Sequence, residues 1–183
     1  MSFAEHLERF HPGSSQAVIA PVRAGVEERL PGFRVLRLAP AAAGEPWIYA
    51  TCGAAQSAAA GEHGAEYVLL APAPDPVLVE MLATLALVNA DAEQKFGVGS
   101  IIALRRSWMA SSWAHHLLVL PPYPFGPGFE VHEKGDRSTV VLWLVPILPA
   151  EAQYVREHGH QALEQILETR NANLADPARR SVV

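Results

Sequence analysis

The chain has 183 residues, of which 50% are hydrophobic and 18% are charged, and this composition excludes a disordered chain and fits a folded globular protein. Its net charge of -5, from 14 basic and 19 acidic residues, excludes binding to nucleic acid through bulk positive charge. The single cysteine, Cys52, excludes an internal disulfide and a zinc site built from several thiolates.

The sequence predicts a cytoplasmic protein with no membrane partner. Residues 1–10 contain acidic side chains and no apolar run of signal-peptide length. The most apolar stretch, residues 77–90, is shorter than the roughly 20 residues that a membrane span needs, and it contains Glu80.

Hydrophobic spacing predicts alternating helical and extended segments in the first part of the chain. Apolar residues recur at helical spacing near the start, and Pro31-Gly32 ends a second helical stretch. Short runs rich in β-branched and aromatic residues favour strands further on. The expected elements are helices over 2–10 and 18–30, strands over 33–38, 47–51 and 66–71, and a small-residue surface loop over 54–64.

The clearest helix begins at Asp75-Pro76, where the aspartate can accept from exposed amides and proline suits the first helical position. It is expected to end near Asp91. The run over 139–145 is apolar at every residue after the first, with branched side chains and one tryptophan, which is typical of a strand buried on both faces. Further strands are expected over 100–104 and 115–120, and a closing helical region over 150–170, in which Gly159 favours a split into two helices.

These elements predict an α+β, or mixed α/β, fold with a central mostly antiparallel or mixed sheet packed by helices. We expect one domain over residues 1–183, with a helical lead-in over 1–32 and a C-terminal tail over 171–183 that has no core-forming periodicity.

Motifs for cofactor chemistry do not fit their required context, so no cofactor is predicted. Gly97-Val98-Gly99 follows a helix and opens a strand, the reverse of a dinucleotide loop. The eight histidines lack the spacing that puts two imidazoles on one helix face, and no metal site is predicted. An alternative reading remains open, in which Cys52, His115 and His116 serve an enzyme or a small-ligand pocket.

The loop aromatics are the best candidates for contact with another protein. Rigid aromatic side chains bury a large area at a small entropic cost, although the same residues would also serve to cap the sheet. The candidate binding residues are Trp108, Trp113, Tyr123, Phe125 and Glu130. A homodimer through an exposed sheet edge is a further alternative.

Several short motifs, in their order along the chain, resemble the suppressor-of-fused family of the bacterial type over residues 33 to 183. The residues that carry the resemblance are Trp47, Tyr49, Thr51, Gly53, Glu66, Tyr67, Gly99, Leu117, Leu118, Pro121, Leu142, Leu144, Val145, Pro146, Ile147, Glu151, Gly159, Leu163, Asp176, Arg179 and Ser181.

The resemblance implies a mixed α/β domain that holds another protein and performs no catalysis. In animals, members of the family sequester a transcription factor, but they have a further C-terminal domain that is not part of this sequence. Bacterial members resemble immunity proteins that neutralise a toxin encoded nearby. The resemblance therefore implies a toxin-like protein partner.

Overall fold

The computed structural model describes residues 2–58, 64–91, 95–134 and 137–183. Its elements follow one another as α1 (Phe3–Phe10), β1 (Gln16–Ile19), α2 (Val26–Arg29), β2 (Arg34–Leu38), β3 (Trp47–Cys52), η1 (Ala54–Ser57), β4 (Gly64–Ala71), α3 (Pro76–Asn89), β5 (Ile101–Ala103), β6 (His116–Leu120), η2 (Tyr123–Phe125), β7 (Val131–Lys134), β8 (Arg137–Ile147), α4 (Pro149–His158) and α5 (His160–Thr169). None of the helices in the described ranges has the length and apolar character needed to cross a bilayer.

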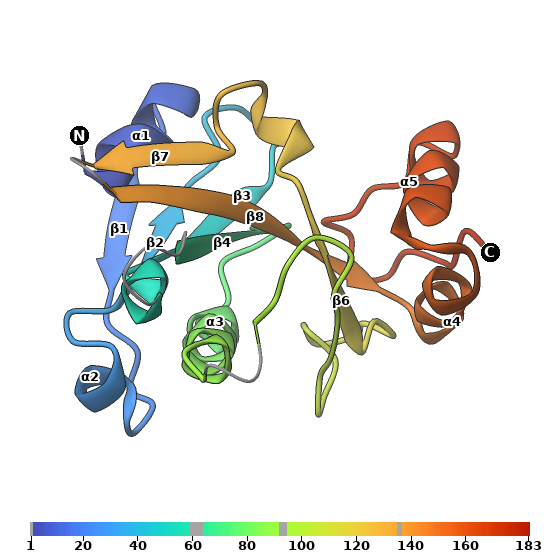
Figure 1. Cartoon of the computed structure of the whole chain (residues 1–183). Coiled ribbons are helices and arrows are strands. Elements are labelled where there is room, and N and C mark those ends of the chain that lie inside the picture. The colour runs from blue at the N-terminus through green and yellow to red at the C-terminus, as the bar shows by residue number, and fades with distance from the viewer. Residues whose placement is uncertain (1, 59–63, 92–94, 135–136) are drawn as a thin grey trace.

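The strands form one mixed sheet, as predicted (Figure 1). Its order is β1-β2-β3-β4-β8-β6-β5, and β7 pairs with β8 outside this path. Every pairing is antiparallel except that of β4 with β8, which run parallel with Tyr67 opposite Leu142. The late strand β8 therefore lies in the middle of the sheet, between an early strand and β6, and β1 and β5 are the edges.

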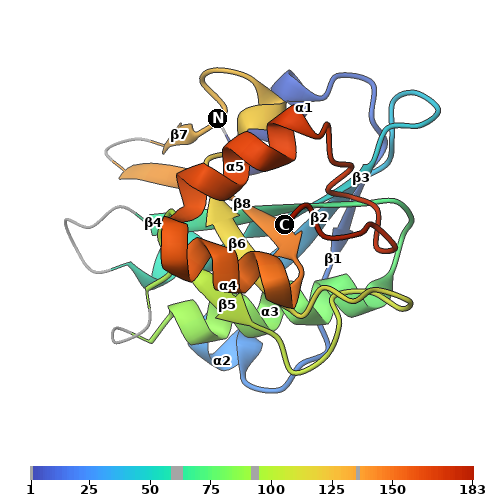
Figure 2. The same cartoon turned by 90° about the vertical axis from the view of Figure 1, so that its right-hand side faces the viewer.

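Both faces of the sheet are covered by helices. Strand β8 shows this best, because side chains alternate between the faces of a strand: Leu142 and Leu144 pack into one core, whereas Trp143 and Val145 pack into the other. The first core includes α2 and α3. The second includes α1, α4 and α5, and Figures 1 and 2 show these helices on the other side of the sheet.

Local signals explain where the main helix begins. Asp75 caps α3 by accepting a 2.9 Å hydrogen bond from the Val77 amide, with Pro76 at the first helical position. The Tyr49 hydroxyl accepts from the Asp75 amide at 2.8 Å and ties this helix to β3. Gly159, at φ +86°, separates α4 from α5. The predicted start of α3 at Asp75-Pro76 and the predicted break at Gly159 are confirmed.

Two local expectations were wrong, and one strand was missed. The predicted helix over 18–30 is a strand followed by the single turn α2, because β-branched Val18 and Ile19 pair with β2 and Pro21 does not continue an α-helix. Strand β7 was missed because its sequence, VHEK, has no apolar pattern. The stretch expected to be a loose surface loop begins with the short helix η1, whose Ala54 is buried; residues 59–63 of that stretch lie outside the described residues.

Candidate functional site

Two buried carboxylates organise the residues on which the family resemblance depends. The first is Glu66 on β4, whose side chain accepts a 2.5 Å hydrogen bond from the Thr51 hydroxyl and bonds from three successive amides at the start of η1. The Thr51 hydroxyl in turn accepts from the Tyr67 amide at 2.8 Å. Burial raises the pKa of Glu66, and the hydrogen bonds oppose this shift. This network shapes the turn at Gly53, which has φ +110°.

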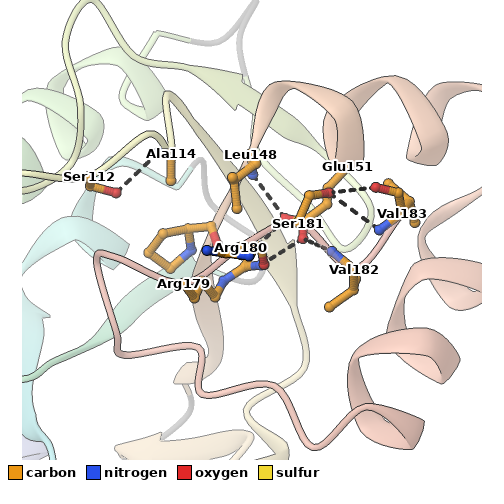
Figure 3. Close-up of polar contacts among 10 residues, drawn as sticks. Ser112, Ala114, Leu148, Glu151, Arg179, Arg180, Ser181, Val182 and Val183 are labelled. Carbon is orange, nitrogen blue, oxygen red and sulfur yellow. Dashed lines mark hydrogen bonds and ion pairs between the residues drawn. The ribbon is translucent and has the colours of Figure 1, made fainter.

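The second buried carboxylate is Glu151 on α4, which is fully buried and binds the C-terminal segment (Figure 3). Both terminal nitrogens of Arg179 donate to its two oxygens at 2.6 Å. The Leu148 amide also donates to Glu151 at 2.9 Å and the Val182 amide at 3.1 Å. The predicted tail, which lacks core periodicity, is therefore anchored by a buried ion pair.

Both carboxylates have every oxygen engaged by donors of the same chain. Glu66 lies 15 residues from its partner Thr51 in the sequence. Glu151 lies 28 residues from its partner Arg179. Groups held in this way fix the backbone, and neither carboxylate lines one of the surface hollows described below. The motif residues around them therefore act as structural anchors.

The Cys52 and histidine alternative is not supported by the sheet order. Cys52 ends β3, whereas His116 begins β6, and strands β4 and β8 lie between them. Three inter-strand spacings of about 4.8 Å place these strands roughly 14 Å apart, far beyond the reach of a hydrogen bond. Among the described residues, no group of three or more metal-ligating side chains comes together either.

The five predicted binding residues occupy two separate places. Trp108 and Trp113 belong to the loop between β5 and β6, and Trp108 packs into the core beside α3. Tyr123, Phe125 and Glu130 belong to the connection between β6 and β7, and Phe125 packs into the core on the other face of the sheet. The structure therefore does not bring the five into one patch.

Exposure divides these five residues further. Trp108 and Phe125 are 1% and 6% exposed, and Phe125 stacks on Phe129 with ring centroids 4.3 Å apart. By contrast, Trp113 and Tyr123 are 73% and 62% exposed. Glu130 is exposed and accepts a hydrogen bond from the Gly128 amide at 2.9 Å. The binding role of the five residues stays a prediction. Only Trp113, Tyr123 and Glu130 have side chains exposed for direct contact with a partner.

Tyr123 forms one wall of a groove with an apolar floor on the face of the sheet that α1, α4 and α5 cover, which we call the α5 groove. Its volume is about 720 Å³. Leu120 and Trp143, paired across β6 and β8, form its floor. The opposite wall is one face of α5 and the segment after it, comprising Gln161, Glu164, Gln165, Leu167, Glu168, Asn171, Ala172 and Leu174.

The α5 groove is acidic. Glu164 and Glu168 lie four residues apart on its wall, and a neighbouring hollow of about 510 Å³, which shares Trp143 and Ala172 with it, adds Glu45. No lysine or arginine is among the described residues that line either hollow. Burial and the negative charge of Glu164 raise the pKa of the Tyr123 hydroxyl. His160 Nε2 lies 3.8 Å from a Glu164 oxygen.

A second large hollow, on the opposite face of the sheet, has the opposite charge character. It lies between α3 and β5, has a volume of about 780 Å³ and includes the buried Trp108. Arg23 lines it together with Arg105 and Arg106. Arg105 and Arg106 are adjacent in the sequence, and the fold adds the distant Arg23 to this pair. Glu80 also lines this hollow, where its carboxylate accepts from the Val22 amide at 2.8 Å.

Sequence reasoning predicted Tyr123 but missed the other groove residues. Gln161, Glu164, Gln165 and Glu168 follow the i, i+3, i+4, i+7 pattern of one helix face, so the polar stripe on α5 was visible in the sequence. The other groove residues, above all Trp143, come from separate elements, and only tertiary packing brings them to the groove. The pairing of Glu151 with Arg179 likewise had no local signal.

The fold and these features define a mixed α/β protein with helices on both faces of its sheet, two buried carboxylate anchors, and surface hollows that are acidic on one face and basic on the other. The chain belongs to the suppressor of fused protein (SUFU) family, whose model matches residues 29–180. The crystal structure of a SUFU homologue from Neisseria gonorrhoeae is similar over 98% of this chain and 94% of that one, with a TM-score of 0.86 and 26% sequence identity.

Two more distant structures share the fold. The crystal structure of the Sufu–Fu complex has a TM-score of 0.72 over 98% of this chain and 90% of that one, and Drosophila Suppressor of Fused has a TM-score of 0.71 over 99% of this chain and 50% of that one; both are 13% identical. Among curated proteins, immunity protein YqcF of Bacillus subtilis is 29% identical over 68 residues, or 37% of this chain. The match spans 35% of YqcF.

Proposed function

We propose that this protein is a non-enzymatic binding protein of the immunity type, which acts in the cytoplasm by sequestering a toxin-like protein. The observation that carries the proposal is its similarity to YqcF, which is named an immunity protein. Membership of the SUFU family supports it, because one structure that shares the fold is that of a Sufu–Fu complex.

The surface fits a binding role. Trp113 and Tyr123 are large aromatic side chains exposed to solvent, and exposed aromatics of this kind are the residues that dominate the energy of protein interfaces. The net charge of -5 would also speed the approach of a basic partner.

The experiment is to purify the tagged protein from its native host and identify what accompanies it by mass spectrometry. The expected result is a stoichiometric partner encoded by an adjacent gene. Expressing that gene in a bacterium should arrest growth, and co-expressing this protein should restore it. A partner whose toxicity persists when it is bound would overturn the immunity function.

The aromatic residues require separate designs. Alanine at exposed Trp113 or Tyr123 removes contact area and leaves the core intact. Alanine at buried Trp108 or Phe125 would cost about 3–5 kcal/mol of stability, so a loss of binding there would reflect unfolding. Growth rescue should therefore be scored only for the exposed positions and for Glu130.

A further inference from the structure

We propose that the α5 groove binds a short, extended, basic segment of the protein partner, with its lysine or arginine side chains against the α5 wall. The inference rests on the proposed function, because it names the chemistry that this surface accepts from such a partner. It is carried by the groove's charge, its apolar floor and an unpaired hydrogen-bond donor in its lining.

Charge selects the occupant. The wall presents Glu164 and Glu168, the adjoining hollow presents Glu45, and no basic side chain is among the described residues that line them. An acidic segment would meet uncompensated repulsion in this groove, whereas a basic one gains complementary charge. The other large hollow, with its three arginines, has the opposite preference.

The walls and floor suit the two parts of a lysine or arginine side chain. Leu120, Trp143 and Leu167 offer apolar surface on which an alkyl stem can pack while its charged end reaches a carboxylate. Tyr123 faces the same groove from η2 and can contact a cation through its ring. Gln161 and Glu168 are seven residues apart on α5, a rise of about 10 Å, which matches roughly three residues of extended chain.

The indole of Trp143 is the unpaired donor. The side chain is 6% exposed and lines both hollows, and its Nε1–H is buried with no hydrogen-bond partner in the described part of the chain. Buried donors without an acceptor are rare and unfavourable. An extended peptide carries a carbonyl oxygen on every residue, and one of them would supply the acceptor once the groups that cover the indole Nε1 in the free protein move aside.

The test uses the whole protein and two capped hexapeptides, one alternating lysine with leucine and one alternating glutamate with leucine. Binding is followed by ¹⁵N–¹H NMR of the four tryptophan side chains, with the Trp143 signal assigned from a Trp143→Phe variant. We expect the lysine peptide to shift the Trp143 indole signal and the glutamate peptide to leave it unchanged. Equal shifts with both peptides, or lysine-peptide shifts confined to Trp108 and Trp113, would overturn the proposal.

Charge variants provide the matched comparison. The double substitution E164Q/E168Q keeps the shape of the wall and should weaken the lysine peptide about tenfold. The control E8Q/E28Q removes the same charge from two exposed glutamates of α1 and α2 and should change affinity less than twofold, since exposed charges at a distance are screened. Equal effects of the two pairs would show attraction by net charge alone and overturn the site.

A third variant adds positive charge to the α5 wall of the groove. Gln161 and Gln165 are exposed on the same wall, and arginine is a good helix former, so Q161R/Q165R should fold and lose detectable lysine-peptide binding. A toxin-like partner that binds the wild type and E164Q/E168Q equally would overturn this inference and leave the proposed function standing. Lysine-peptide binding in the groove of a protein that has no partner in its host would overturn the function and support the groove.

Discussion

Arg179 forms a bidentate ion pair with Glu151, in which each terminal nitrogen of the guanidinium lies 2.6 Å from a different carboxylate oxygen. The arginine side chain is 8% exposed and the glutamate is fully buried. Arg179 also donates to the carbonyl oxygen of Pro146 at 2.8 Å, so one side chain connects the C-terminal segment to the end of β8 and the start of α4 (Figure 3).

Removing the arginine should destabilise the protein strongly. Arg179→Met keeps much of the side-chain volume but leaves the Glu151 carboxylate buried without its counter-ion, a situation that costs about 3–5 kcal/mol. Urea unfolding followed by circular dichroism measures the change in the free energy of unfolding. The control, Arg180→Met at an exposed neighbour, should change it by less than about 0.5 kcal/mol, and similar losses for the two variants would refute the role of the ion pair.

The hydroxyl of Thr51 should matter far more than the shape of its side chain. Thr51→Val keeps the shape but leaves the Tyr67 amide without its acceptor and Glu66 without a donor, which should cost about 1–3 kcal/mol. Thr51→Ser restores the hydroxyl and should recover most of this loss. Thr169→Val, at an exposed hydroxyl, is the matched control, and a serine variant as unstable as the valine variant would contradict the prediction.

Stability should fall on mild acidification because of His116. Burial, followed by the positive charges of Arg156 and His115, lowers the pKa of His116 in the folded protein, so the unfolded chain takes up the proton first. The free energy of unfolding should therefore be highest above the unfolded value of about 6.5 and decline as the pH drops from there towards the lower folded value.

The variant His116→Gln should show a smaller decline between about pH 7 and pH 5, because it lacks this titration. Urea unfolding at the two pH values gives both declines. The same variant at about pH 8, where His116 is neutral in both states, measures any effect of the substitution that does not involve a proton. Equal declines for the wild type and the variant would exclude a contribution from His116.

Replacing exposed aromatics one at a time should show which side of the sheet the partner covers. Tyr123→Ala removes the aromatic wall of the α5 groove and should weaken partner binding about tenfold, the range typical of an aromatic interface anchor. Trp113→Ala probes the loop on the α3 side. Calorimetric titration of both variants with the purified partner gives the two affinities. A loss for Trp113→Ala alone would place the partner on the α3 side and contradict the expectation.

The elements that sequence reasoning placed correctly are those with a strong local cause. Asp75 and Pro76 mark the beginning of α3 by capping chemistry, and Gly159 marks the break between α4 and α5 by its positive φ. The run over 139–145, which lies within β8, has no polar residue after its first, and its side chains pack into both cores. The strand over 16–19 has no such signal, because its partner β2 and the turn after it decide its conformation.

The candidate site was less predictable for the same reason. Tyr123 stood out as an aromatic residue in a proline-rich turn, but the glutamates that face it come from α5, 41 residues further along the chain in the case of Glu164. Trp108 and Phe125 lie in loop-like segments, as expected, and their rings pack into the two cores. Burial of a loop aromatic depends on what covers it, which spacing along the chain does not reveal.

The docking of the C-terminal segment has a consequence for the timing of biosynthesis. Ala172 and Leu174 form part of the wall of the α5 groove, and the segment that follows is held in place by Arg179. A chain emerging from the ribosome can pair β1 through β4 early, but this wall is anchored only once residue 179 has left the exit tunnel. Capture of a partner in the groove should therefore have to wait until residue 179 has emerged, because α5 alone does not hold this wall in place.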